Sequence, residues 1–189
     1  LLEGTPIQLV GVATAGVDHM DIDYLDSRGI AWCSASGCNA NSVSEYVVAS
    51  LLVLSERRGR PLAGLVLGVI GVGHVGSAVA EKARALGMTV LEHDPPRQAQ
   101  EPERAWTDLP TLLESADVVT LHVPLVEDGL YRTRGLADAA FFGRLRAGAW
   151  FINSCRGEVV EETELLNALD TRHMAAVLDV WDHEPCFQR

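Results

Sequence analysis

The stretch that decides the fold runs from Leu65 to Asp94. It reads LVLGVI (65–70), GVGHVG (71–76), SAVAEKARALGM (77–88) and TVLEHD (89–94). An unbroken apolar run, as in a parallel strand buried on both faces, is followed by a glycine-rich turn and a helical pattern. A second apolar run then ends in an acid. This order of parts is typical of a dinucleotide-binding strand–turn–helix unit.

Each glycine of the turn has a predicted task. Gly71 allows a tight turn, Gly73 lets the backbone approach a pyrophosphate, and Gly76 lets the helix pack close to the strand. The helix is expected to begin near His74, and its first N–H groups, including those of His74 and Val75, should face the phosphates. The alternative is an α/β turn of the same shape that holds no ligand.

Asp94 bears on the choice of nucleotide. It follows Gly71 at about the 20-residue offset at which an acid meets a ribose hydroxyl. A carboxylate there repels a 2′-phosphate, so the predicted cofactor is NAD rather than NADP. Arg97 lies close enough to complicate this preference.

Composition bounds the partners. The chain has 189 residues, of which 48% are hydrophobic and 22% charged, as in ordinary globular proteins. Its net charge of −11 argues against nucleic acid and anionic membranes as partners, and no apolar run reaches the ~18 residues of a membrane span. The four cysteines form no C-x-x-C pair, so we expect no metal site and reduced thiols in a cytoplasmic protein.

Alternating helical and extended patterns predict an α/β fold, a Rossmann-like doubly wound parallel sheet. Its predicted strands are 65–70, 88–93, 118–122, 149–153 and 175–180, with helices at 74–86, 108–115, 138–145 and 162–169. Upstream, the pattern predicts a strand at 8–12, a helix at 22–27 and a strand at 30–33. The polar, proline-rich segment 95–104 is expected to be a surface loop.

A long helix is predicted from Asn41 or Ser42 to about Arg58, with Glu45 completing a capping box. Its broad apolar face should bury Val43, Val47, Ala49, Leu51, Leu52 and Leu54. Such a face is suited to packing between lobes or against a second subunit, so a homodimer is expected. Gly59–Pro61 breaks the helix, and we place a domain boundary there. The chain then divides into 1–41, a connecting helix 42–60, and a nucleotide domain 61–189.

Two further segments follow predicted strands. Asn153-Ser154-Cys155-Arg156-Gly157 comes after one, and Asp179-Val180-Trp181-Asp182-His183-Glu184-Pro185 comes after the next. Open α/β sheets bind ligands at these carboxyl ends. An arginine such as Arg156 can fork a substrate carboxylate, and a glutamate such as Glu184 can raise the pKa of a catalytic histidine. The plainer alternatives are an ion pair of Arg156 with Glu158 or Glu161, a solvated Glu184, and Asp179 as a helix cap.

Together, G-x-G-x-x-G, N-x-x-R-G and D-V-x-x-x-E-P resemble the D-isomer-specific 2-hydroxyacid dehydrogenases. The resemblance implies hydride transfer from a small anionic 2-hydroxy acid to NAD, with 1–41 as part of a flavodoxin-like substrate domain. Arg156 would bind the carboxylate, and Glu184 would tune the acid/base histidine. The remaining implied contacts are Thr14 to substrate and, to NAD, Gly71, Gly73, His74, Val75, Gly76, Asp94, Val123, Cys155 and Asp179. Val123 replaces a threonine, so only its backbone contact carries over.

Several stretches resemble one branch of this family more closely, among them 13–19, 37–40, 94–97 and 178–181. That branch oxidises a phosphorylated four-carbon hydroxy acid in pyridoxal 5′-phosphate biosynthesis. The alternatives are a phosphoglycerate or glyoxylate type of enzyme, and a catalytically incomplete NAD-binding module.

The resemblance places the catalytic histidine well beyond Glu184, whereas the sequence ends at Arg189. With no initiator Met at Leu1, we therefore expect a piece of a longer enzyme, inactive by itself. His183 neighbours Glu184 and is expected to be an exposed loop residue.

Overall fold

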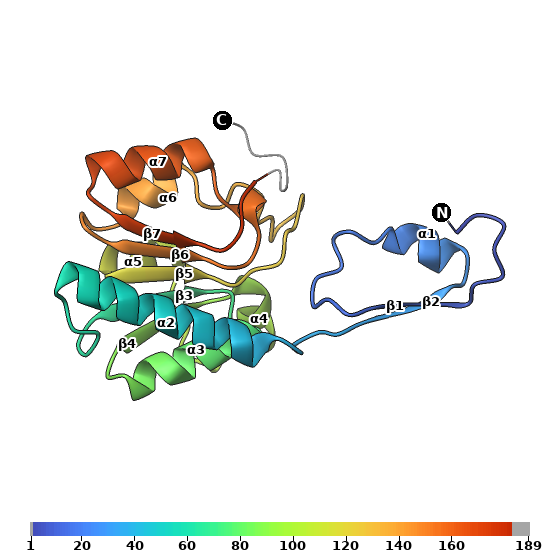
Figure 1. Cartoon of the computed structure of the whole chain (residues 1–189), viewed down its shortest axis with the longest axis horizontal. Coiled ribbons are helices and arrows are strands. Elements are labelled where there is room, and N and C mark those ends of the chain that lie inside the picture. The colour runs from blue at the N-terminus through green and yellow to red at the C-terminus, as the bar shows by residue number, and fades with distance from the viewer. Residues whose placement is uncertain (1, 183–189) are drawn as a thin grey trace. The chain divides into compact units, whose positions relative to one another are not determined.

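A computed structural model of the chain describes residues 2–182 (Figure 1). The contacts between residues divide the chain into two compact units, with the boundary between Ala40 and Asn41. The first unit contains β1 (Leu9–Val12), α1 (Ile22–Ser27) and β2 (Ala31–Ser34), and its two strands pair in parallel. Leu25 and Ile30 are buried, whereas Leu9 is 63% exposed. The predicted strand–helix–strand order of this unit is confirmed.

The second unit is built on five parallel strands. They are β3 (Val66–Ile70), β4 (Thr89–His93), β5 (Val118–Leu121), β6 (Trp150–Asn153) and β7 (Ala175–Leu178), in the order β4-β3-β5-β6-β7. Every neighbouring pair is parallel. The chain leaves β3 for β4 on one side and then returns to β5 on the other. Open α/β sheets bind ligands at such a reversal, beyond the carboxyl ends of the strands.

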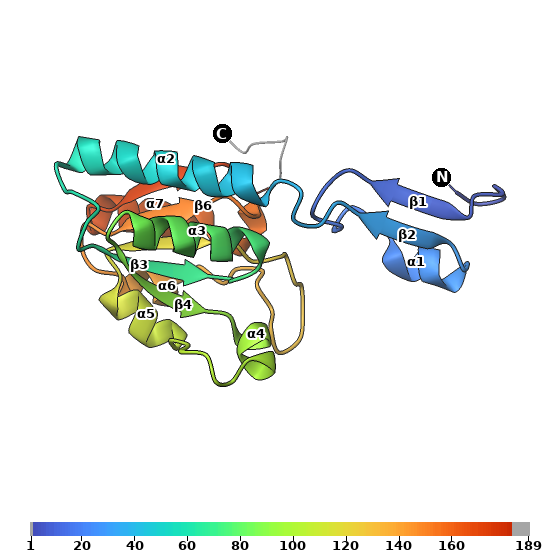
Figure 2. The same ribbon diagram turned by 90° about the horizontal axis from the view of Figure 1, so that it is seen from below.

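Helices cover both faces of this sheet, as the doubly wound prediction requires (Figure 2). On one face, α2 (Ala40–Arg58) and α3 (His74–Ala85) pack on Leu67, Val69 and Ile152. On the other face, α5 (Leu109–Ser115), α6 (Ala139–Arg144) and α7 (Glu162–Thr171) pack on Val119, Leu121 and Phe151. Alternate residues of each strand therefore serve different faces.

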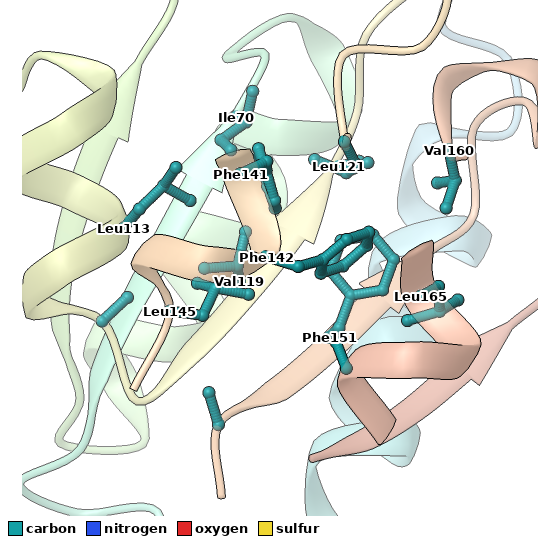
Figure 3. Close-up of a cluster of buried hydrophobic side chains, with 14 of the residues drawn as sticks. Ile70, Leu113, Val119, Leu121, Phe141, Phe142, Leu145, Phe151, Val160 and Leu165 are labelled. Atoms are coloured by element: carbon teal, nitrogen blue, oxygen red, sulfur yellow. The ribbon is translucent and has the colours of Figure 1, made fainter. Parts of the chain in front are cut away.

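The second face has an aromatic centre (Figure 3). The Phe142 and Phe151 rings meet edge-on with their centroids 5.3 Å apart, and Phe141 lies 5.4 Å from Phe142. All three rings are buried. Edge-to-face pairs add to the stabilisation that burial gives, so these rings hold helix α6 firmly against strand β6.

Two local predictions are wrong. The segment expected to be a loop begins with a short helix, α4 (Pro95–Gln100). Asp94 caps this helix, and prolines occupy its first positions, where the missing N–H has no helical partner to lose. The capping box at Ser42 does not form, because α2 already begins at Ala40. Instead, the Asn41 side chain donates to Glu45 Oε1 at 2.7 Å.

Helix α2 also differs from expectation in what it buries. Val47, Leu51 and Leu54 are buried against the sheet, but Leu52 is 51% exposed and Ala49 is also exposed. The helix groups with the second unit, so the contacts divide at its beginning rather than at Gly59–Pro61. Among the described residues, none of the helices is both long and apolar enough to cross a membrane.

Candidate functional site

The turn after β3 has three glycines in three different surroundings. Gly71 has a φ of +85°, and a Cβ there would lie 2.5 Å from the His122 carbonyl oxygen. A Cβ on Gly76 would lie 2.0 Å from the Gly71 carbonyl oxygen. A Cβ on Gly73 would meet nothing within 4 Å. Two glycines are therefore required by the fold, whereas the third leaves open backbone at the beginning of α3.

His74 and Val75 form the first turn of α3 directly after this open backbone. Gly73 provides the N-cap and has no side chain to satisfy the first N–H groups. His74 is exposed and Val75 half-buried. Unpaired N–H groups and the positive end of the helix dipole favour an anion at this position.

Asp94 stands at the end of β4 and supports the same turn. Its Oδ2 accepts a hydrogen bond from the Val72 N–H at 2.8 Å, and its Oδ1 accepts one from the Arg97 N–H at 3.0 Å. Each carboxylate oxygen can accept a second hydrogen bond. Asp94 therefore fixes the glycine turn and keeps acceptor capacity for a ligand hydroxyl.

A cavity of about 440 Å³ opens beside the turn, within the second unit. Its wall is mostly apolar, and it lies where the strand order reverses between β3 and β5. Its size falls in the range of ligand pockets. The residues that line it are Ile70, Gly71, Gly73, His93, Asp94, Pro95, Pro96, His122, Val123, Pro124, Val126, Leu130, Tyr131, Arg132, Thr133 and Leu136.

His122, which the sequence pattern indicated only as a strand-end residue, lines this cavity. Its Nε2 lies 3.0 Å from the hydroxyl of the buried Thr120. Burial lowers the pKa of the imidazole to about 4, so the ring is neutral near pH 7. It therefore adds no positive charge to the cavity wall.

The turn after β6 is held by one buried side chain. Asn153 Oδ1 accepts from the Cys155 N–H at 3.1 Å, and its Nδ2 donates to the Arg156 carbonyl at 2.8 Å. Burial raises the pKa of the Cys155 thiol, and its contacts include the backbone of Val123. Because a nucleophilic cysteine needs a low pKa, Cys155 is unsuited to that role. Arg156 Nη1 donates to the Cys155 carbonyl at 2.7 Å.

The segments after β6 and β7 meet at Gly157. A Cβ on Gly157 would lie 2.0 Å from the Trp181 carbonyl carbon. The Asp179 N–H donates to the Asn153 carbonyl at 2.9 Å, and the Asp182 N–H donates to Glu162 Oε1 at 3.0 Å. Asp179 and Arg156 thus lie on neighbouring segments at the carboxyl edge of the sheet.

The predicted residues fall into three groups. Those after β3, β4, β5, β6 and β7 share the carboxyl edge of one sheet. Thr14 belongs to the first unit, where its hydroxyl donates to the Gly16 carbonyl at 2.9 Å. Glu184 and His183 lie outside the described residues. The anchoring role of Asn153 was not predicted; the available signal was an amide side chain three positions before Arg156.

The parallel sheet carries a glycine turn after β3, Asp94 after β4, and a cavity where the strand order reverses. These features define a Rossmann-type dinucleotide-binding domain. A family model described as "D-isomer specific 2-hydroxyacid dehydrogenase, NAD binding domain" matches residues 41–189. The chain belongs to this family. NAD, the cofactor expected from Asp94, is confirmed as the cofactor that this family domain binds.

Curated relatives also support the predicted branch. An erythronate-4-phosphate dehydrogenase of Azotobacter vinelandii is 50% identical over 186 residues, which cover 98% of this chain and 49% of the relative. One of Salinibacter ruber is 49% identical over 190 residues, covering 98% and 48%. The chain thus spans about half the length of these relatives.

Solved structures agree on the fold. A D-lactate dehydrogenase of Aquifex aeolicus, complexed with NAD and lactic acid, superposes with a TM-score of 0.82 at 29% identity. The match covers 96% of this chain and 60% of that one. An NAD-dependent formate dehydrogenase of Staphylococcus aureus, in complex with NAD, gives 0.80 at 26% identity over 95% of this chain.

Proposed function

We propose that the chain is the NAD-binding part of an enzyme that oxidises the 2-hydroxyl of 4-phospho-D-erythronate in pyridoxal 5′-phosphate biosynthesis. The observation that carries this proposal is the identity of 43–50% to erythronate-4-phosphate dehydrogenases over 98% of the chain. A glycine turn that leaves Gly73 open to a ligand supports the use of NAD.

The proposed roles follow from the chemistry of each residue. NAD, when bound, would supply the acceptor for the hydride that leaves C2 of the substrate. The open backbone from Gly73 to Val75 takes the pyrophosphate, and Asp94 accepts hydrogen bonds from the adenosine ribose. Val123 and Cys155, which contact one another, line the cofactor site, and Asp179 contacts NAD at the next segment.

Arg156 is proposed to bind the substrate carboxylate and to polarise the ketone as it forms. A guanidinium suits both tasks, because it offers paired N–H donors and stays charged. The hydroxyl proton passes to a histidine, which the family resemblance predicts and which Glu184 tunes. Thr14 is proposed to contact the substrate, as the family resemblance implies.

The test is an assay of NADH formation by the native protein. With NAD present, we expect 4-phospho-D-erythronate to give kcat/KM at least about 100-fold above D-glycerate, because the 4-phosphate adds charged contacts. Equal values for phosphorylated and plain 2-hydroxy acids would contradict the proposed substrate. Arg156→Gln should reduce kcat/KM by about 100-fold, whereas Arg144→Gln, which breaks an exposed ion pair with Glu114, should not.

The 189-residue chain alone is expected to form no NADH, since the predicted histidine is not among its residues. Detectable NADH formation by this chain would contradict that expectation.

A homodimer is proposed from helix α2. Tyr46, Leu52 and Val53 are 38%, 51% and 46% exposed, so an apolar side remains beside the buried one. Sedimentation should give twice the chain mass, and Leu52→Glu should give the monomer. A monomeric wild type would contradict this proposal. We also propose a cytoplasmic location, which the cysteine pattern led us to expect.

A further inference from the structure

Arg97 connects helix α4 to the glycine turn. Its Nη1 donates to the Val72 carbonyl and, at 3.1 Å, to the Ser77 hydroxyl of α3. Its Nε donates to Glu101 Oε1 at 2.9 Å. Three of the five N–H donors of the guanidinium are therefore engaged by the protein.

The Glu101 carboxylate that holds Arg97 is itself held. Arg104 lies 3.6 Å from Glu101 and also pairs with the buried Glu92, and Arg104 stacks 4.7 Å from the centroid of the Trp106 ring. Trp106 Nε1 donates to the Glu101 carbonyl at 2.8 Å. The Arg97 hydrogen bond lowers the pKa of Glu101, so the carboxylate stays charged near neutral pH. Charges of alternating sign thus run from Arg97 to the edge strand β4.

This arrangement matters for the choice of nucleotide. A 2′-phosphate on the ribose would approach Asp94, whose negative charge repels it, and an arginine nearby is the usual remedy. Arg97 lies three positions along the chain, and its backbone N–H is bound to Asp94 itself. Its side chain, however, points to the glycine turn and carries Glu101 as a counter-ion.

We propose that Arg97 is a specificity-determining residue of the dinucleotide site. Its bonds to Val72, Ser77 and Glu101 brace the glycine turn and withhold the guanidinium from a 2′-phosphate. Selectivity for NAD then depends on Glu101 as well as on Asp94. The inference rests on the NAD site of the proposed function and is independent of the substrate.

The test measures the Kd values of NADH and NADPH for the 189-residue chain by fluorescence titration. Asp94→Ser removes the negative charge that repels the 2′-phosphate of NADPH, and the further substitutions are made in this variant. Adding Glu101→Gln should strengthen NADPH binding by about fivefold and change NADH binding by less than about twofold, because the guanidinium loses its counter-ion. Adding Arg97→Gln as well should remove the gain. Glu114→Gln in the same background, which breaks the exposed pair with Arg144, should leave the ratio unchanged.

Arg97→Gln alone tests the brace. It should weaken NADH binding by about fivefold without strengthening NADPH, and Arg97→Lys should recover part of the loss because a charged donor returns to the turn. A NADPH gain that persists without Arg97, or an unchanged ratio in the Glu101 variant, would overturn the proposal. Since no substrate is added, these results are distinct from failure of the substrate assignment.

Discussion

The turn after β3 and the turn after β6 leave parallel strands at the same edge of one sheet, and each contains a glycine that has no room for a side chain. At Gly76 the obstructing atom belongs to Gly71, within the same turn. At Gly157 the obstructing atoms belong to Trp181 and Asp182, from a separate segment after β7. The contact at Gly76 thus lies within its own turn, whereas the contact at Gly157 joins two separate segments.

The side chains that support the two turns show the opposite arrangement. Asp94 supports the first turn from the end of the neighbouring strand β4, whereas Asn153 supports the second from within its own strand. The turn after β3 presents bare N–H groups, which suit a pyrophosphate in any dinucleotide. The turn after β6 carries Arg156, which we propose binds the substrate carboxylate. The comparison separates a general cofactor site from a proposed substrate site.

Gly76→Ala should have the largest effect on stability. Its Cβ would overlap the Gly71 carbonyl, and backbone cannot move aside as a flexible side chain can, so we expect the free energy of unfolding to fall by about 3 kcal/mol or more. Gly73→Ala is the matched control, with open space and an expected loss below about 1 kcal/mol. Denaturant unfolding measures both. Equal losses would contradict the different tasks given to the two glycines.

Gly157→Ala probes the second turn. Its Cβ would overlap the backbone at Trp181 and Asp182, so we expect a loss of about 2–3 kcal/mol as that segment is displaced. Amide exchange of Asp179 should accelerate, since its N–H is bonded to Asn153 beside this contact. If stability falls with no change at Asp179, the two segments are not coupled as described.

Asn153→Ala removes the side chain that holds the second turn. The Cys155 N–H and the Arg156 carbonyl both lose their partner at a buried site, so we expect a loss of about 2 kcal/mol. Asn167→Ala, on the exposed side of α7, should cost less than about 0.5 kcal/mol. Unfolding curves of the pair that coincide would exclude this role for Asn153.

His122→Asn should have the smallest effect, visible only as a dependence on pH. The folded pKa of His122 is about 4, below the ordinary 6.5, so the unfolded chain binds the proton more readily between these values. Stability therefore falls as pH drops through this window, by about 1–2 kcal/mol for this half-buried ring. Wild type and variant should be about equally stable at pH 7, and the variant should become the more stable of the two as pH falls from 7 to 4. A constant difference would contradict the lowered pKa.

The comparison also explains what the sequence could predict. Strands β3 to β7 were predicted within a residue or two, because apolar runs between turn signals are local features. The close packing at Gly76 was predicted, because its contact with Gly71 lies within one short motif. The contact of Gly157 with Trp181 could not be predicted in that way, since it joins segments that only the fold brings together.

Helix α4 was missed for a different reason. The prolines at 95 and 96 indicated a loop, yet Asp94 before them provides a cap and proline suits the first helical turn. The anchoring of Arg97 was missed because its partners Val72 and Ser77 lie in the preceding strand–helix unit. Local composition indicated a polar surface, whereas the side chains form a defined network.

The most direct test of the central claim is calorimetric titration of NADH into the 189-residue chain and into Gly73→Val. The account predicts that one NADH binds each wild-type chain and that binding falls at least about 100-fold in the variant, whose side chain fills the open side of the turn. Thermal unfolding of the unliganded variant should stay close to wild type. Equal NADH affinities in two equally stable proteins would contradict the assignment of this turn as the dinucleotide site.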